Sequence, residues 1–204
     1  MPKVSEEHLR ARRAQILDAA ARCFARAGFH RTTIQDIAAE SGFSAGLIYR
    51  YFADKDDMIV AIAGRWHESQ ARRLHLDGPG DPGDRGADAF RRVVAGYLDL
   101  LRSLAAPDEG RRVQLGVQIW AEALRAPQVH EVARQGVDLP RGVIAELVRA
   151  AQERGELPAG WPADGLARVF IAIYQGLALQ TAWEPELDNA AFVETVQGLL
   201  DTLN

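Results

Sequence analysis

Apolar side chains recur along most of the chain at intervals of three and four residues, the spacing of one face of an α-helix. Residues 7–27 carry such a stripe, and others predict helices over about 54–74 and along 90–104 and 113–124. No long stretch alternates apolar and polar residues as a half-buried strand does. The pattern therefore predicts an all-α fold of about nine helices.

Between the first two long helices the pattern breaks into two short ones. Thr32 and Thr33 are both candidate N-caps, because each has a Gln or Asp three residues further on that can complete a capping box. The first short helix then runs to about residue 40. A tight turn follows at residues 41–43, and Ser44 caps a second short helix that reaches about residue 51.

Glycine and proline mark the boundaries of the later elements. Residues 77–86 are rich in both and predict a loop. Residues 128–154 are helical but contain Pro140, which predicts a kink or a division. Pro162 opens a helix to about residue 183, and Asn189 precedes a last helix to about Leu203. We place a first domain at residues 1–53 and a second at residues 54–204.

Composition changes this picture in three ways. An apolar fraction of 48% suffices for a packed core. The net charge of −4 conceals a basic first part, because residues 1–76 carry 12 Lys and Arg against 9 Asp and Glu. A basic segment favours contact with nucleic acid, since phosphate charge is neutralised locally. Cys23 is the only cysteine, which excludes an internal disulfide.

The N-terminal residues lack an apolar signal segment, and no run of about 18 apolar residues is present. We therefore expect a cytoplasmic protein without a membrane partner. No metal-ligand spacing or cofactor motif is apparent, so we expect no metal and no cofactor.

Residues 34–51 meet the requirements of a helix-turn-helix. Ala38 is the small residue needed where the two helices cross, and Gly42 suits a turn with positive φ. Apolar residues at both helices can anchor them to a core: Ile34, Ile37, Phe43, Ile48 and Tyr51. The exposed face of the second helix would then be free to enter a DNA groove.

These residues resemble the TetR family of ligand-responsive repressors. The resemblance covers about residues 10–62 and lies in the segments TTIQDIA at 32–38, SGFSAG at 41–46, and IYRYF at 48–52 followed by DKDDMI at 54–59. Tyr51 stands where the family often has histidine. The later segment WAEA at 120–123, with Gly176-Leu177, is similar to a subset of the family that includes choline-responsive regulators.

The resemblance implies a homodimeric repressor on a palindromic DNA operator, released by a small-molecule effector. It also implies a DNA-binding role for individual residues. A phosphate contact is implied for Thr33, and the recognition helix would present Ser44, Ala45, Gly46, Leu47 and Tyr49 to the DNA, with Tyr49 bonding to phosphate. Arg50 and Lys55 are further candidate backbone contacts. Lys55 also stands in a first helical turn, where the dipole disfavours a cation by about 0.3–1 kcal/mol unless an anion is near.

Each role has a plainer alternative. Thr33 can act as a cap alone, Tyr49 can pack, and Lys55 can be a solvated surface lysine. Arg10, Arg12 and Arg13 form either a basic arm or a solvated helix face.

The second part of the chain carries two further predictions. Two terminal helices are apolar over most of their circumference, and in the family they form the dimer interface; its candidate residues are Leu166, Ile173, Leu177, Phe192, Val196, Leu199 and Leu203. Inward-facing stripes and nearby polar groups suggest a ligand pocket of Trp66, Tyr97, Leu101, Gln118, Trp120, Glu122, Phe170 and Tyr174. Ordinary core is the alternative for each pocket residue, and Glu122 beside Trp120 would suit a cationic ligand.

Two other classes of protein compete with this interpretation. An enzyme on a helical bundle would need a paired Glu-x-x-His motif, a phosphate loop or a nucleophile with its base, and the five histidines show no such spacing. A helical ligand carrier with a vestigial helix-turn-helix would lack salt-dependent DNA binding. We predict a DNA-binding regulator and not an enzyme.

Overall fold

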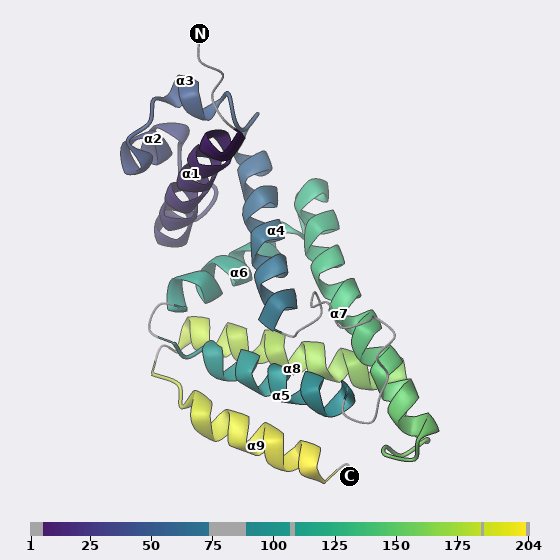
Figure 1. Ribbon diagram of the computed structural model, residues 1–204. Coiled ribbons are helices and arrows are strands. Elements are labelled where there is room, and N and C mark those ends of the chain that lie inside the picture. The colour runs from purple at the N-terminus through teal and green to yellow at the C-terminus, as the bar shows by residue number, and fades with distance from the viewer. Residues whose placement is uncertain (1–5, 74–88, 107–108, 185, 203–204) are drawn as a thin grey trace. The chain divides into compact units, whose positions relative to one another are not determined.

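The computed structural model describes residues 6–73, 89–106, 109–184 and 186–202, and all regular structure within these ranges is helical (Figure 1). The prediction of an all-α fold is confirmed. In chain order the helices are α1 (Glu6–Ala27), α2 (Ile34–Ser41), α3 (Ala45–Ile48), α4 (Lys55–Arg73), α5 (Ala89–Ser103), α6 (Gly110–Glu122), α7 (Pro127–Glu153), α8 (Ala163–Trp183) and α9 (Asn189–Asp201). None of the helices in these ranges has the length and apolar character needed to cross a membrane.

The described helices form two compact units. The first comprises Met1–Arg65 with Gln114–Ala133, and the second comprises Trp66–Val113 with Arg134–Asn204. Helices α4, α6 and α7 each contribute residues to both units. This division differs from the boundary expected between residues 53 and 54, because the first unit includes a second, distant segment of the chain.

The first unit has a core built from the apolar faces of α1, α2, α3 and α4. α2 contacts both α1 and α3 (Figure 1). The largest fully buried side chains include Phe24 of α1, Ile37 of α2, Ile48 of α3 and Met58 of α4. Each of these helices thus contributes apolar surface to one core, which fixes its orientation within the unit.

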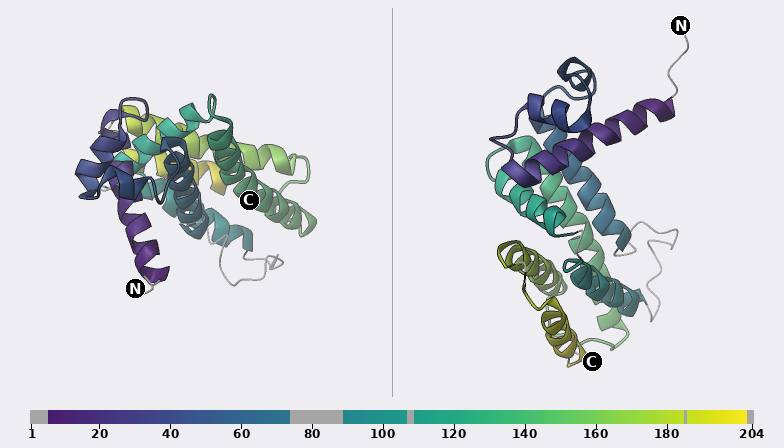
Figure 2. Two further views of the ribbon diagram at one scale, coloured as in Figure 1. Left: turned by 90° about the horizontal axis from the view of Figure 1, so that it is seen from above. Right: turned by 90° about the vertical axis from the view of Figure 1, so that its left-hand side faces the viewer.

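The second unit has its own core around α5 and α8. Tyr97 of α5 meets Phe170 of α8 edge-to-face at 5.0 Å, and its hydroxyl donates to the Phe170 carbonyl at 2.7 Å. α9 lies beside α5 (Figures 1 and 2). Leu101 and Leu177 are fully buried in this unit.

Helix boundaries match the sequence pattern with two exceptions. α7 continues through Pro140 without a division, because one missing backbone hydrogen bond is offset by buried apolar residues on both sides of it, such as Val129 and Val148. α3 ends at Ile48, earlier than expected, and the chain continues in hydrogen-bonded turns from Arg50 to Leu47 and from Tyr51 to Ile48. The loop expected at residues 77–86 lies outside the described residues.

Candidate nucleic-acid interface and ligand-facing residues

The N-terminus of α2 is closed by a reciprocal capping box. The Thr33 hydroxyl accepts the Asp36 backbone N–H, and the Thr33 N–H donates to the Asp36 carboxylate at 2.8 Å. The hydrogen bond from the Thr33 backbone holds the pKa of Asp36 below its usual value, and the Thr33 hydroxyl adds to the effect. Of the two candidate caps, Thr33 is the one used. Its side chain stays exposed at a rigid helix terminus.

Thr32 serves the interior instead. It is 1% exposed, and its hydroxyl lies 2.8 Å from the Gly28 carbonyl and 3.3 Å from the Cys23 carbonyl. The two adjacent threonines therefore have different tasks: Thr32 closes the turn after α1, and Thr33 begins α2.

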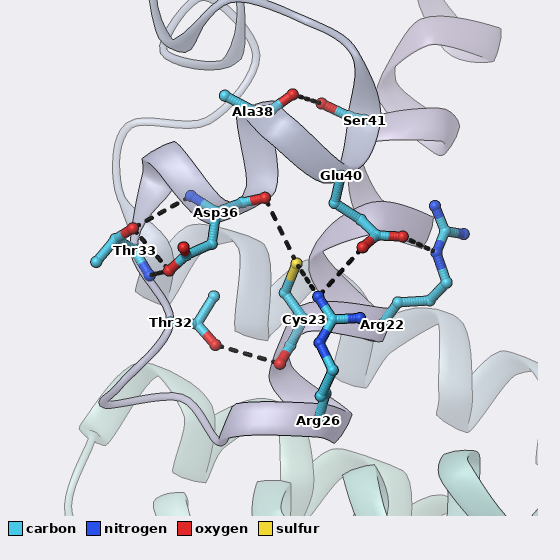
Figure 3. Close-up of polar contacts among 9 residues, drawn as sticks. All are labelled: Arg22, Cys23, Arg26, Thr32, Thr33, Asp36, Ala38, Glu40 and Ser41. Atoms are coloured by element: carbon cyan, nitrogen blue, oxygen red, sulfur yellow. Dashed lines mark hydrogen bonds and ion pairs between the residues drawn. The ribbon is translucent and has the colours of Figure 1, made fainter.

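A fork of two arginines fixes the other end of α2 to α1. Arg22 and Arg26 of α1 both contact the Glu40 carboxylate, at 2.7 Å and 3.2 Å (Figure 3). Hydrogen bonds from these arginines hold the pKa of Glu40 below its usual value, and the bond from Arg22 has the larger effect. Arg26 also approaches the buried thiol of Cys23, which donates to the Asp36 carbonyl. Burial raises the pKa of this thiol, so Cys23 is a core residue of the α1–α2 junction.

The turn between α2 and α3 has the geometry that the sequence predicts. Gly42 is in the left-handed region with φ 73°, and its N–H returns to the Ala38 carbonyl. Ser44 caps α3 by accepting the Leu47 N–H at 3.2 Å. A side chain with a β-carbon would be strained at position 42, which explains the glycine.

α3 has one buried and one outward face. Ile48 is fully buried, whereas Tyr49 is 57% exposed and Gly46 is exposed. A β-carbon at position 46 would meet nothing within 4 Å. Ser44 is also exposed, and Ala45 and Leu47 are half-buried. The outward surface of α3 therefore has small side chains at its centre and the phenol of Tyr49 at its end.

The cationic candidates divide into three groups. Arg50 is exposed after α3. Lys55, at the start of α4, is half-buried and donates to the Phe29 carbonyl at 2.8 Å and the Thr32 carbonyl at 3.0 Å. The two carbonyls therefore stabilise the Lys55 ammonium group, for which the sequence alone suggested a phosphate partner. Arg10 and Arg13 lie within α1, where Arg13 stacks over the Phe52 ring at 4.8 Å. This region is a helix face and not an extended arm.

Three of the expected pocket residues belong to the core of the second unit. Tyr97, Leu101 and Phe170 are each no more than 3% exposed, and the Tyr97 hydroxyl already has a carbonyl acceptor. Tyr174 on α8 is half-buried, and burial raises the pKa of its hydroxyl to about 12, against an opposing hydrogen bond from Trp66. Trp66 and Tyr174 therefore lie together within this unit, and their role in a ligand pocket stays a prediction.

The other pocket candidates lie in the first unit. The Glu122 carboxylate lies 3.3 Å from Nε2 of His30, so it has a partner within the chain. Gln118 is half-buried, and its Oε1 atom has no hydrogen-bond partner among the described residues. Trp120 is half-buried as well.

Sequence reasoning missed two polar groups on α4. Among the described side chains, Nε2 of His67 and Oε1 of Gln70 are buried without a hydrogen-bond partner. Burial lowers the pKa of His67, which favours the neutral ring. The sequence did contain a signal: the apolar stripe of Ile59, Ile62 and Trp66 continues at helical spacing to the polar residue Gln70.

Family models match both parts of the chain. Residues 16–62 match the model of bacterial regulatory proteins of the tetR family. Residues 86–204, more than half of the chain, match the C-terminal model of BetI-type transcriptional repressors. The chain belongs to the TetR family. It carries the DNA-binding helix-turn-helix of these transcriptional repressors, and the resemblance stated from the sequence is confirmed.

Individual TetR-family relatives match the chain to different extents. The chain is 51% identical over 78 residues to the transcriptional repressor Rv1474c of Mycobacterium tuberculosis, a match that covers 38% of this chain and 42% of that protein. It is 30% identical to the regulator BetI of Serratia proteamaculans over 89% of this chain and 87% of that protein. High identity is thus confined to part of the chain, whereas weaker similarity extends over most of it.

Solved structures agree with the TetR-family fold over nearly the full length. GusR of Salmonella enterica superposes with a TM-score of 0.74 at 26% identity, covering 98% of both chains. A regulator from Saccharomonospora viridis in complex with choline superposes with a TM-score of 0.73 at 23% identity, covering 93% of this chain and 95% of that one. The second likeness shows the fold alone.

The residues expected at a TetR-family dimer interface fall into two sets. Leu177 and Val196 are buried in the chain's own second unit, because they lie on the inner faces of α8 and α9. Leu166, Ile173 and Phe192 are half-buried, and Leu199 is 60% exposed. Val169 and Trp183, which the prediction omitted, are 51% and 74% exposed on α8. Leu203 lies outside the described residues.

Proposed function

We propose that this TetR-family protein is a homodimeric repressor that binds a palindromic operator through α3 and is released by a small molecule. The outward face of α3 carries the proposal. Gly46 leaves its centre low, the exposed phenol of Tyr49 stands at its end, and Ile48 anchors the opposite face in the core. A buried Gly46 or Tyr49 would have removed the basis for DNA recognition.

Base contacts and backbone contacts come from different residues. Ser44 can donate to a base edge, and Ala45 and Leu47 can contact the methyl group of thymine. Tyr49 and Arg50 contact phosphate on the flanks of the same groove, and Thr33 contacts it from the N-terminus of α2. The phosphate contacts determine the affinity and the position of the protein on the duplex, whereas the small residues at the centre of α3 contact the bases and determine sequence specificity.

The dimer forms through α8 and α9. Val169 and Trp183 of α8 and Leu199 of α9 are apolar and largely exposed, so these two helices have apolar side chains available for a partner. A two-fold axis through this surface buries them, and a symmetric dimer suits half-sites about 34–36 Å apart, one turn of DNA.

The effector contacts the polar groups of α4 in the second unit. His67 Nε2 and Gln70 Oε1 lack partners among the described residues, so a bound molecule that supplies hydrogen bonds would remove an unfavourable feature. Arg73 and Glu109 in the same unit form an ion pair, so neither charge is left to attract a charged effector. This combination favours an uncharged effector with a hydrogen-bond donor over the cation that Glu122 suggested from sequence.

Selection of bound fragments from a random duplex pool at low salt tests the proposal. We expect enrichment of palindromic fragments with half-sites about one helical turn apart. Arg50→Met should reduce the dependence of affinity on salt by about one phosphate contact, a slope change of about 0.9. Failure to enrich any duplex would favour a ligand carrier whose helix-turn-helix no longer binds DNA.

A further inference from the structure

The ammonium group of Lys55 joins two elements that are far apart in the sequence. It donates to the carbonyls of Phe29 and Thr32, 26 and 23 residues earlier in the chain. Lys55 is the first residue of α4, and both acceptors lie in the turn that follows α1. One side chain therefore connects the start of α4 to the segment that leads into α2.

That turn is itself well ordered by other contacts. Gly28 has φ 80°, and its N–H returns to the Phe24 carbonyl at 2.7 Å. Phe29 meets Phe24 edge-to-face at 5.0 Å, and Thr32 is almost fully buried. The two carbonyls thus face Lys55 from a backbone that cannot easily turn them toward water, which makes the ammonium their compensating donor.

The residue type at position 55 fits this task. The chain has 24 Lys and Arg residues, and only positions 3 and 55 are lysine. A compact ammonium can direct separate N–H bonds to carbonyls of two different residues, whereas the planar guanidinium matches flat, bidentate acceptors. The choice of lysine in an arginine-rich chain agrees with the two-carbonyl geometry.

Thr33 is next to this contact in the chain. Thr33 directly follows Thr32, one of the two acceptors, and is the N-cap of α2. The hydrogen bond between Lys55 and the Thr32 carbonyl thus links the start of α4 to the helix start that carries Thr33. α4 is 19 residues long and carries the unpartnered groups of His67 and Gln70 near its other end.

We propose that Lys55 is a positioning residue for DNA binding: it holds the N-terminus of α2 in place through the Phe29 and Thr32 carbonyls and couples that terminus to α4. This inference rests on the proposed DNA-binding function. In this proposal Lys55 does not contact phosphate itself. It positions Thr33, which does.

Amide hydrogen exchange on the full-length protein tests the contact itself. Lys55→Met should increase exchange about tenfold or more at the backbone N–H groups of Thr32 and Ile37, which bond to Gly28 and Thr33. Amides in the second half of α4 should keep their protection, and Lys55→Arg should restore part of the effect. Unchanged exchange at Thr32 and Ile37 in Lys55→Met would overturn the inference.

A double-mutant cycle on a duplex recovered by selection tests the coupling to DNA. Lys55→Met and Thr33→Ala should each weaken binding about tenfold, and the double variant should be little weaker than either one. The salt dependence of Lys55→Met should match the wild type, whereas Arg50→Met loses about 0.9 from its slope. Additive effects, or a slope loss of about 0.9 in Lys55→Met, would instead indicate a direct phosphate contact.

The two proposals fail in different ways. If no duplex is recovered, the DNA-binding function is refuted, and with it the role of Lys55 in DNA binding. If a duplex is recovered and Arg50→Met weakens its binding while Lys55→Met does not, only the role of Lys55 is refuted.

Discussion

The imidazole ring of His67 in α4 occupies the space that a side chain at position 136 of α7 would need. Both residues belong to the second unit, so this contact defines how closely the two helices approach there. Glycine at position 136 is therefore a packing requirement and not a feature of the local backbone conformation, because its φ is in the ordinary helical range.

Gly136→Ala should destabilise the protein, although alanine favours helix by about 1 kcal/mol over glycine. The added methyl group overlaps the ring of His67, and overpacking of this kind costs about 1–3 kcal/mol. Gly142→Ala on the same helix is the matched control, since its β-carbon meets nothing within 4 Å. It should leave stability unchanged or raise it. Urea unfolding measures both, and equal effects of the two substitutions would contradict the packing role.

Acidification should weaken the fold through His67. Burial holds the pKa of His67 below its ordinary value of 6.5, so the unfolded chain binds this proton more readily than the folded one. The free energy of unfolding should therefore be fully maintained above about pH 6.5 and decline as the pH falls below it. Chemical unfolding at several pH values measures the decline. His67→Asn should show a shallower pH dependence across this range, and an identical profile would exclude His67 as its source.

Gln70→Leu should stabilise the ligand-free protein by about 1 kcal/mol. The substitution removes a buried amide oxygen that lacks a hydrogen-bond partner among the described residues and replaces it with apolar surface. A thermal melt of the free protein should show a higher Tm. A lower Tm would mean that the amide of Gln70 is satisfied in the folded protein, and it would remove Gln70 from the proposed effector contacts.

Gly46→Leu should separate folding from DNA binding. The site is exposed, and a β-carbon there meets nothing within 4 Å, so the substitution should not reduce thermal stability. A bulky side chain on the outward face of α3 should hold the helix away from the groove and lower operator affinity at least tenfold. Titration of a selected duplex measures the loss. Unchanged affinity would place the DNA surface elsewhere.

Leu199→Glu should shift the protein toward monomers without unfolding it. Leu199 is 60% exposed in the single chain, so the carboxylate meets water in a monomer but is buried in the proposed dimer. Sedimentation of this variant and of Val169→Glu should show weakened association by about tenfold or more. Glu194→Gln, an exposed position on α9, is the control for a change of charge on this helix. A wild-type protein that sediments as a monomer would contradict the proposed dimer.

Local signals predicted the fold well because short-range physics determines them. The capping box at Thr33, the left-handed Gly42 and the Ser44 cap each depend on residues within four positions, and the structure confirms all three. The apolar stripes likewise gave the right helices. Pro140 does not divide α7, since tertiary burial along the helix outweighs the local penalty of proline, and the alternative of a kink stays a prediction.

Longer-range relationships could not be derived from the pattern. Lys55 lies 23 residues or more from its acceptors, and a helical stripe does not indicate which backbone carbonyls remain to be satisfied. Leu177 and Leu199 lie on apolar stripes of equal appearance, yet one is in the chain's own core and the other on its surface. Separating core, pocket and interface requires knowing which helices are neighbours.

The chain leaves the first unit after Arg65 and returns to it at Gln114–Ala133. Leu115, Ile119 and Val129 of this returning segment are buried. A chimaera that takes only residues 1–65 from a relative would therefore lack part of the buried core of the first unit. Chimaeras that transplant both segments together should retain cooperative unfolding, because the residues that pack with the helix-turn-helix include this second, distant segment.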